Sequence, residues 1–341
     1  MSEILIADIG GTTSRAAFAA PGQRPDNIVT IANDSVAGPE GLLERMLDGA
    51  TALPRAAVFA LAGPINGNEI TLTNRDWCWR LPDLSARFGI SSIHAVNDFE
   101  ALAWAVPSLT DKDLQPIGEN KIFADGVKLV VGPGTGLGTA ALVPNCDGYQ
   151  VIASEGGHCS FGPAFADEEP IFRRLAEEKA PLSAECIISG PGLARLHMAM
   201  HPGIMKLTPE MIVTQARVGD RQARATIAMF VRLLGRFAGD MALAFKATGG
   251  VYIAGGVATG LGALFDARLF RASFERHPPY EAMLKDIPSA LITCVEPGLI
   301  GCIAVAERLI GKVQASPAGR VGRVQLRSSR LRSSRLEPFR L

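Results

Sequence analysis

The chain has 341 residues, of which 48% are hydrophobic and 20% charged, and this composition suits about two globular domains with a large core. The formal net charge is zero, but residues 313–341 contain seven arginines and one glutamate, so they carry +6 and the rest of the chain −6. The mildly acidic body argues against a nucleic-acid partner, and because no apolar run approaches roughly 18 residues, we expect no membrane span.

The cysteines and the N-terminus indicate the compartment. Six cysteines occur without a Cys-x-x-Cys spacing, which argues against a zinc knuckle or a redox dithiol and favours free thiols. Residues 4–7 predict a strand that meets Asp8 almost at once, so the pattern of a signal peptide does not fit. We therefore expect a cytoplasmic protein.

The first motif in the chain is this strand and the glycine turn that follows it. Asp8 stands at the end of the strand, and residues 10–13 read Gly-Gly-Thr-Thr. Glycines let backbone N–H groups approach an oxyanion, as in a phosphate-binding nest. The Asp8 carboxylate would repel a bare phosphate, and a Mg²⁺ that keeps its waters would remove this conflict. An ordinary Gly-Gly hairpin with a surface aspartate explains the same residues, and this stretch alone leaves both interpretations open.

A second aspartate follows a later strand. Residues 56–61 and 92–96 predict strands, and residues 99–106 predict a helix. Asn97 and Asp98 stand between the second of these strands and the helix, where either residue can be a helix N-cap and nothing more. Alternatively, Asp98 projects into a cleft at the carboxyl end of the strand, where open α/β sheets bind ligands.

Two further glycine turns occur later in the chain. Residues 109–123 look like a crossover into a second domain, and residues 128–142 again run from an apolar strand through a Gly/Thr turn into another strand. An apolar stripe at helical spacing predicts a long helix over 220–245, and Gly255-Gly256 ends the strand that follows it. Two similar hairpins and a later Gly-Gly turn suggest two similar halves that face one nucleotide.

Polar residues gather near the second of these turns. Glu155 and His158 flank Gly156-Gly157, so two polar groups can reach one small ligand, although a single histidine is more often structural. Glu185 precedes another Gly/Pro turn. Phosphoryl transfer needs positioning and charge neutralisation more than covalent catalysis. Because carboxylates read hydroxyl groups well and reject a substrate that is already phosphorylated, Asp98, Glu155 and Glu185 favour a neutral polyol as acceptor.

The glycine spacing excludes two common classes of nucleotide-binding protein. Gly132, Gly134, Gly136 and Gly138 alternate, so the G-x-G-x-x-G fingerprint fails, and no Gly-Lys-Ser/Thr follows for a P-loop. Each hairpin also returns as a strand, whereas both rival motifs open a helix. A Rossmann oxidoreductase and a P-loop NTPase are therefore excluded.

The end of the chain has no apolar periodicity. The pentapeptide Leu-Arg-Ser-Ser-Arg begins at Leu326 and repeats at once from Leu331, and such a period fits neither a helix nor a strand. We expect residues 314–341 to form a disordered basic tail.

Seven short motifs follow one another over about residues 3–311. They are Ala7-Asp8-Ile9-Gly10-Gly11-Thr12, Leu61-Ala62-Gly63-Pro64-Ile65, Thr73-Asn74-x-x-Trp77, Val96-Asn97-Asp98-Phe99, Gly132-Pro133-Gly134-Thr135-Gly136-Leu137-Gly138, Glu155-Gly156-Gly157-His158 and Ser189-Gly190-Pro191-Gly192-Leu193. Each motif alone is weak, but in this order they together resemble bacterial glucokinase, of the hexokinase/actin/Hsp70-like sugar kinase superfamily.

The resemblance implies an α/β fold of two ribonuclease-H-like domains of the actin/hexokinase type, with a cleft between them. Residues 1–108 plus 298–313 would form the smaller domain and residues 109–297 the larger one. It also implies ATP- and Mg²⁺-dependent phosphorylation of glucose at its 6-hydroxyl to give glucose 6-phosphate and ADP, the first step of glycolytic glucose use, by a homodimer. The Cys-rich zinc site of the related repressor/sugar-kinase group is absent here.

The resemblance assigns roles to single residues. Asp98 would be the base that accepts the proton of the sugar 6-hydroxyl. The residues implied to bind the other hydroxyls are Asn74, Asn97, Glu155, His158 and Glu185. The residues implied to bind ATP are Ala7, Asp8, Ile9, Gly10, Gly11 and Thr12 at the phosphates, Gly134, Thr135 and Gly136 at the β- and γ-phosphates, and Gly255 and Gly256 near the adenosine. Asp8 would hold the Mg²⁺ through water.

Two alternatives remain open from the sequence. One is a kinase of the same fold for another hexose or an amino sugar. The other is a non-enzymatic sugar-sensing regulator, which would need a DNA-binding segment. We expect none, because Asp8 stands too near the N-terminus for a preceding helix-turn-helix, and a catalytic base would be superfluous in a regulator.

Overall fold

The computed structural model describes residues 4–50, 52–63, 65, 67–72, 75–119, 125–146 and 148–315, and all structural statements below refer to these residues. The N-terminal part forms a sheet with the strand order β3-β2-β1-β4-β7. Its strands are β1 (Ile4–Ile9), β2 (Thr13–Ala19), β3 (Val29–Ala32), β4 (Ala56–Leu61) and β7 (Ser92–Asn97). The first three strands pair antiparallel, and β4 and β7 continue the sheet in parallel with β1.

A second sheet repeats this arrangement. Its order is β11-β10-β9-β12-β13-β8, with β8 (Leu114–Pro116), β9 (Lys128–Pro133), β10 (Leu137–Asn145), β11 (Gly148–Ser154), β12 (Gly250–Ile253) and β13 (Ser289–Ile292). Strands β9, β10 and β11 form an antiparallel meander, and β12 and β13 run parallel to β9, as β4 and β7 do to β1. The expected two similar halves are therefore confirmed. A separate ribbon pairs β5 (Glu69–Thr71) with β6 (Cys78–Arg80).

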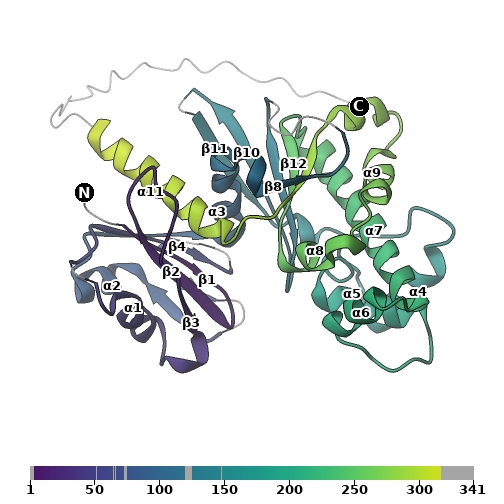
Figure 1. Ribbon diagram of the computed structural model, residues 1–341, viewed down its shortest axis with the longest axis horizontal. Helices are drawn as coiled ribbons and strands as arrows, with labels where there is room; N and C mark the ends of the chain where they lie inside the picture. Colours follow the sequence, from purple (N-terminus) through teal and green to yellow (C-terminus); the bar gives the residue numbers. More distant parts are fainter. Residues whose placement is uncertain are drawn as a thin grey trace, which may run out of the picture.

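Helices cover both faces of each sheet (Figure 1). The first sheet packs α1 (Pro39–Leu47) and α2 (Leu81–Phe88) on one face, and α3 (Asp98–Ala105) and α11 (Pro297–Ala315) on the other. The outer face of the second sheet carries helices between β11 and β13. They are α4 (Glu169–Glu178), α5 (Gly190–Met200), α6 (Pro209–Arg217), α7 (Arg221–Phe245), α8 (Gly256–Leu261), α9 (Ala267–Glu275) and α10 (Glu281–Asp286).

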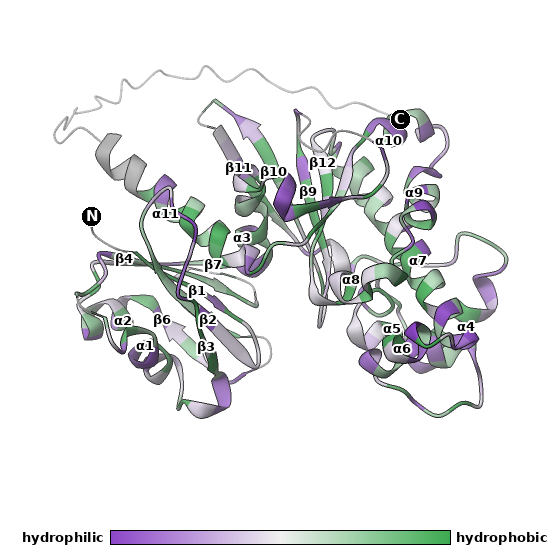
Figure 2. Cartoon of the chain, in the orientation of Figure 1, coloured by the Kyte–Doolittle hydropathy of each residue, from purple (hydrophilic) through white to green (hydrophobic). Residues whose placement is uncertain are grey.

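The alternation of side chains along the strands decides which helix each residue meets. Leu5 and Ala7 face α1 and α2, whereas Ile4 and Ile6 face α3 and α11. In the second sheet, Val130 lies on the side of α3 with other apolar strand residues. Helices α3 and α11 therefore lie between the two sheets, and Figure 2 shows hydrophobic residues where α11 meets α3 and the first sheet.

The helix signals read from the sequence are confirmed in detail. The long helix α7 begins after Asp220, whose side chain accepts a hydrogen bond from the N–H of Ala223 (2.8 Å), and it ends at Phe245. Two boundaries were wrong. The helix expected over residues 99–106 begins at Asp98 and ends at Ala105. Residues 314 and 315 continue α11, which ends at Ala315, whereas the tail was expected from residue 314. The rest of the expected tail lies outside the described residues. Among the helices that the structure describes, none has the length and apolar character needed to span a membrane.

Candidate active site

The first glycine turn joins β1 to β2 and is held from behind by side chains. The N–H of Gly10 donates to the carbonyl of Thr13 (3.1 Å), which closes the turn. Asn33 donates its amide to the carbonyl of Gly10 (2.8 Å), and Arg75 donates its Nε to the carbonyl of Gly11. Sequence reasoning missed Asn33 and Arg75, because only the folded sheet brings them behind the turn.

The six residues expected around this turn differ in accessibility. Ala7 and Ile9 are fully buried, with side chains in the core beneath α1 and α2. Asp8, Gly10 and Gly11 are half-buried, and Thr12 is exposed. Therefore only Asp8, Gly10, Gly11 and Thr12 can offer a side chain or an accessible backbone group to a ligand.

Two half-buried carboxylates near the end of β1, those of Asp8 and Asp98, have raised pKa values. Burial, followed by the charge of Asp8, raises the pKa of Asp98 to about 7. Burial, followed by the charge of Glu296, raises the pKa of Asp8 to about 6, and the charge of Arg15 opposes this shift. Arg15 and Glu296 themselves form an ion pair (Nε to Oε1, 2.9 Å). Asp8 thus contributes to the raised pKa of Asp98, whereas the pKa of Asp8 responds to its burial, to Glu296 and to Arg15.

The helix-cap interpretation applies to Asn97 and not to Asp98. The Oδ1 of Asn97 accepts the N–H groups of Phe99 (2.9 Å) and Glu100 (3.4 Å), and Glu100 returns a capping-box bond to the N–H of Asn97 (3.0 Å). The Nδ2 of Asn97 donates to the carbonyl of Gly63 (3.0 Å), which ties the start of α3 to the end of β4. Asp98 is the first residue of α3, and its Oδ1 also accepts the N–H of Phe99 (3.0 Å). Because the Oδ1 of Asn97 accepts the same N–H, the cap does not depend on the Asp98 carboxylate.

Phe99 brings the start of α3 against the second glycine turn. A Cβ atom at Gly138 would lie 2.0 Å from the Phe99 ring, and one at Gly132 would lie 2.6 Å from it. Gly132 and Gly138 are partners in the β9–β10 ladder, so only a pair without side chains leaves room for this ring. These two glycines therefore serve packing, and they place Asp98 beside the hairpin.

Glu155, His158 and Glu185 come together just beyond the end of β11. The Nε2 of His158 lies 3.8 Å from the Oε2 of Glu185 and 4.0 Å from the Oε2 of Glu155. The side chains are 76% exposed for Glu155, 58% for His158 and 32% for Glu185, so the cluster is open to a ligand. The Oε2 of Glu185 also accepts the N–H of Leu137 (3.0 Å), the residue that follows the glycine turn.

A pocket of about 1270 Å³ opens on the other side of this turn, large enough for a nucleotide. Gly134, Thr135 and Gly256 line it, as expected of nucleotide-binding residues. Gly136 is not in the pocket lining and faces Glu185 instead. Gly255 is the N-cap of α8 with φ +91°, and the carbonyl of Pro133 occupies the space that a side chain on Gly255 would need. The pocket is also lined by residues that the sequence did not assign to the nucleotide, among them Gly190, Arg195, Lys206, Thr208 and Val257.

One expected sugar ligand, Asn74, lies outside the described residues. Within the part of the chain that the structure describes, no group of three or more His, Cys, Asp or Glu residues gathers as a metal site. The half-buried carboxylate of Asp8 nonetheless fits a Mg²⁺ held mainly through water, because this ion prefers oxygen ligands and keeps several waters.

Two similar α/β halves, a glycine turn from each sheet, a pocket beside one turn and a carboxylate at the start of the helix between the sheets define a sugar kinase of the actin/hexokinase class. A family model described as glucokinase matches residues 5–309. The chain belongs to the glucokinase family.

Similar proteins agree with this assignment. A glucokinase from Chelativorans sp. (strain BNC1) is 37% identical over 332 residues, which cover 94% of this chain and 96% of the relative. A glucokinase from Agrobacterium fabrum (strain C58) is 35% identical, covering 89% of this chain and 92% of the relative.

Solved structures give the same picture. The crystal structure of glucokinase from an Antarctic psychrotroph superimposes with a TM-score of 0.82 at 29% identity, covering 90% of this chain and 99% of that chain. A ROK family glucokinase from Streptomyces griseus, in complex with glucose and AMPPNP, has the same fold with a TM-score of 0.63 at 22% identity, covering 90% and 99%. The expected fold class is thus confirmed.

Proposed function

We propose that this chain transfers the γ-phosphoryl group of ATP to the 6-hydroxyl of glucose, giving glucose 6-phosphate and ADP, with Asp98 as the general base. The observation that carries the proposal is a half-buried carboxylate of raised pKa, beside Asp8, at the start of a helix that packs on both sheets. A primary hydroxyl is a poor nucleophile, and a positioned carboxylate orients it and accepts its proton as the bond to phosphorus forms.

The sugar would lie between Asp98 and the cluster of Glu155, His158 and Glu185. Ionised carboxylates accept hydrogen bonds from hydroxyl groups, and His158 can donate or accept according to its tautomer. Asn97 and Asn74 would complete the set of sugar ligands, with the amide of Asn97 already oriented by its capping bonds. Negative charge around the sugar disfavours a substrate that already carries phosphate.

ATP would occupy the pocket lined by Gly134, Thr135 and Gly256, with its phosphates between this turn and the turn of Gly10 to Thr12. Asp8 would hold a Mg²⁺ through water, and this ion supplies charge neutralisation at the transferring phosphates when it is bound. Gly136 and Gly255 shape the surrounding backbone, and they support the site without lining the pocket.

The remaining expectations are part of the proposal. The packing of α11 on β1 and β4 supports a smaller domain of residues 1–108 plus 298–313 and a larger one of residues 109–297. The free cysteines support a cytoplasmic location. A homodimer without nucleic-acid or membrane partners follows from the resemblance and the acidic body of the chain.

A coupled kinase assay with ATP and Mg²⁺ across glucose, mannose, fructose, glucosamine and N-acetylglucosamine tests this function. We expect the highest kcat/KM for glucose and no turnover of glucose 6-phosphate. A higher kcat/KM for an amino sugar would show that the amino sugar, and not glucose, is the preferred substrate. The absence of turnover with every sugar would refute the proposal that the chain is a sugar kinase.

A further inference from the structure

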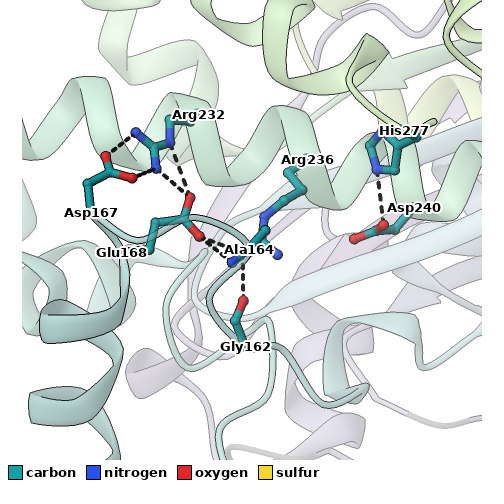
Figure 3. A network of polar contacts seen from close by, with 8 residues as sticks. All are labelled: Gly162, Ala164, Asp167, Glu168, Arg232, Arg236, Asp240 and His277. Carbon is teal, nitrogen blue, oxygen red and sulfur yellow. Dashed lines mark hydrogen bonds and ion pairs between the residues drawn. The ribbon is translucent and has the colours of Figure 1, made fainter.

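A buried ion-pair network lies behind the loop that follows His158. Glu168 precedes α4, and its side chain is 0% exposed. Its Oε1 accepts two bonds from Arg232 of α7 (3.1 and 2.7 Å), and its Oε2 lies 3.5 Å from Arg236, one helical turn further along α7. Figure 3 shows both arginines of α7 pointing toward Glu168. A fully buried carboxylate persists only where cations and donors surround it, so this network fixes its own geometry.

The inner half of the network is bonded to the loop backbone. The N–H of Ala164 donates to the Oε2 of Glu168 (2.8 Å), and Arg236 donates to the carbonyl of Gly162 (2.8 Å) (Figure 3). The guanidinium of Arg236 also stacks over the ring of Phe161, 4.0 Å from its centre. Residues 161–164 are thus fastened to α7 by one arginine and one carboxylate.

The same loop is paired on its other side with the segment that leads to Glu185. Phe161 donates its N–H to the carbonyl of Leu182 (3.0 Å), and Ala184 donates to the carbonyl of Cys159 (3.1 Å). The N–H of Glu185 then bonds to the carbonyl of Gly157 (2.8 Å). His158 and Glu185 therefore extend from one short backbone ladder. Arg236 and Glu168 hold the other end of this ladder, through Gly162 and Ala164.

We propose that Arg236 and Glu168 are positioning residues for sugar recognition, which set the distance between His158 and Glu185 through this ladder. The inference rests on the proposed function, in which these two side chains bind glucose. Hydroxyl recognition depends on placement, and a shift of about 1 Å in a binding group can cost up to about 100-fold in rate or affinity. Glu168, Arg232 and Arg236 do not line the nucleotide pocket, so we expect the larger effect on the sugar.

Arg236→Met is the informative variant. Methionine keeps much of the length and packing of the side chain but donates no hydrogen bond, and Glu168 keeps both bonds from Arg232, so no buried charge is left unpaired. We expect the glucose KM to rise about five- to twentyfold while kcat and the ATP KM stay within about threefold. Arg236→Lys, which keeps one donor, should restore part of the glucose KM.

Asp167→Asn is the matched control. Asp167 belongs to the same network and accepts two bonds from Arg232, but its side chain is 58% exposed and has no bond to the loop backbone. We expect its glucose KM to stay within about twofold of the wild type, since Arg232 still pairs with Glu168.

Hydrogen exchange of the ligand-free proteins gives a readout that does not depend on activity. Peptides covering residues 159–164 should exchange faster in Arg236→Met than in the wild type, and at the wild-type rate in Asp167→Asn. A wild-type glucose KM or unchanged exchange in Arg236→Met would overturn the inference, as would equal losses in kcat and in both KM values. A wild-type protein that fails to phosphorylate glucose would instead refute the proposed function, and this inference with it.

Discussion

Asp98 and Asn97 divide their tasks at the start of α3. Asn97 caps the helix, so Asp98→Asn removes proton acceptance and leaves the capping box intact. We expect kcat to fall by at least about 100-fold, the typical contribution of a general base. Glucose binding by calorimetry should remain measurable, and the Tm should not fall. Near-wild-type turnover by the purified variant would contradict the catalytic role of Asp98.

The same substitution should stabilise the ligand-free protein in a pH-dependent way. Asp98 has a pKa of about 7 in the folded chain, against an ordinary value of 3.8, so the folded state binds more protons between these values. Its contribution to stability is therefore full below pH 3.8 and is lost as the pH rises through 7. In buffer with a metal chelator, Asp98→Asn should exceed the wild-type Tm by about 3–6 °C near pH 8, and by much less near pH 4.5. A Tm difference that does not change with pH would show that Asp98 is not held at a raised pKa.

Glu155 and Glu185 should act mainly on the sugar. Replacing either with glutamine keeps its shape but weakens a charge-assisted hydrogen bond worth about 1.5–3 kcal/mol. We expect the glucose KM to rise at least about tenfold in each variant, the effect of losing such a bond. The ATP KM should change little, because the side-chain carbonyl of a glutamine at position 185 can still accept the N–H of Leu137. A raised ATP KM with normal glucose KM would place the nucleotide at this cluster.

At the scale of elements, the contact between α3 and the β9–β10 hairpin sets the geometry of the proposed active site. Gly138→Ala would drive a methyl group into the ring of Phe99 and push α3 away from the hairpin. We expect a lower Tm and a lower kcat, with both partly restored in the double variant that also carries Phe99→Leu. Gly134→Ala is the control for the fold, because no atom lies within 4 Å of its added methyl group. A wild-type Tm and kcat for Gly138→Ala would show that the ring moves at no cost.

The elements predicted from the sequence were those whose signals are local. Strand β4 has its expected bounds, and α7 begins after Asp220 as expected, because each depends on a few neighbouring residues. From the sequence, the alternating glycines of the second turn predict phosphate binding alone. Two of them accommodate Phe99, which reaches them from another strand–helix unit.

The same limit applies to the site. Glu155, His158 and Glu185 lie together in the structure. They could be named from the sequence because each stands in or next to a short glycine motif. The contacts of Asn33 and Arg75 with the first turn could not be predicted, because each residue approaches the turn from outside its motif. Arg236 falls within the predicted helix over 220–245, but its contact with Gly162 exists only after α7 folds against the loop.

At the scale of the whole molecule, the two groups of residues that we propose to bind the sugar come from different sheets. Asp98 follows β7 of the first sheet, whereas Glu155 follows β11 of the second, so on this proposal one glucose bridges the two. Arg24, in the β2–β3 connection, already pairs with Asp113 next to β8 (2.7 Å between NH1 and Oδ1). Glucose should make the particle more compact by small-angle scattering, and mannitol, an open-chain polyol, serves as the control. An unchanged radius of gyration at saturating glucose would rule out closure.

The return of α11 to the first sheet has a consequence for synthesis of the chain. The thiol of Cys302 contacts the carbonyl of Ala7 (3.6 Å), 295 residues earlier, and Leu299 covers Ile4 and Ile6 beside it. A ribosome releases the N-terminal strands first, and α3 can cover part of this face early, yet the part that α11 covers stays exposed until residues near 300 emerge. The nascent chain therefore displays this apolar strip to chaperones during elongation, and maturation of its first half must wait for translation of α11.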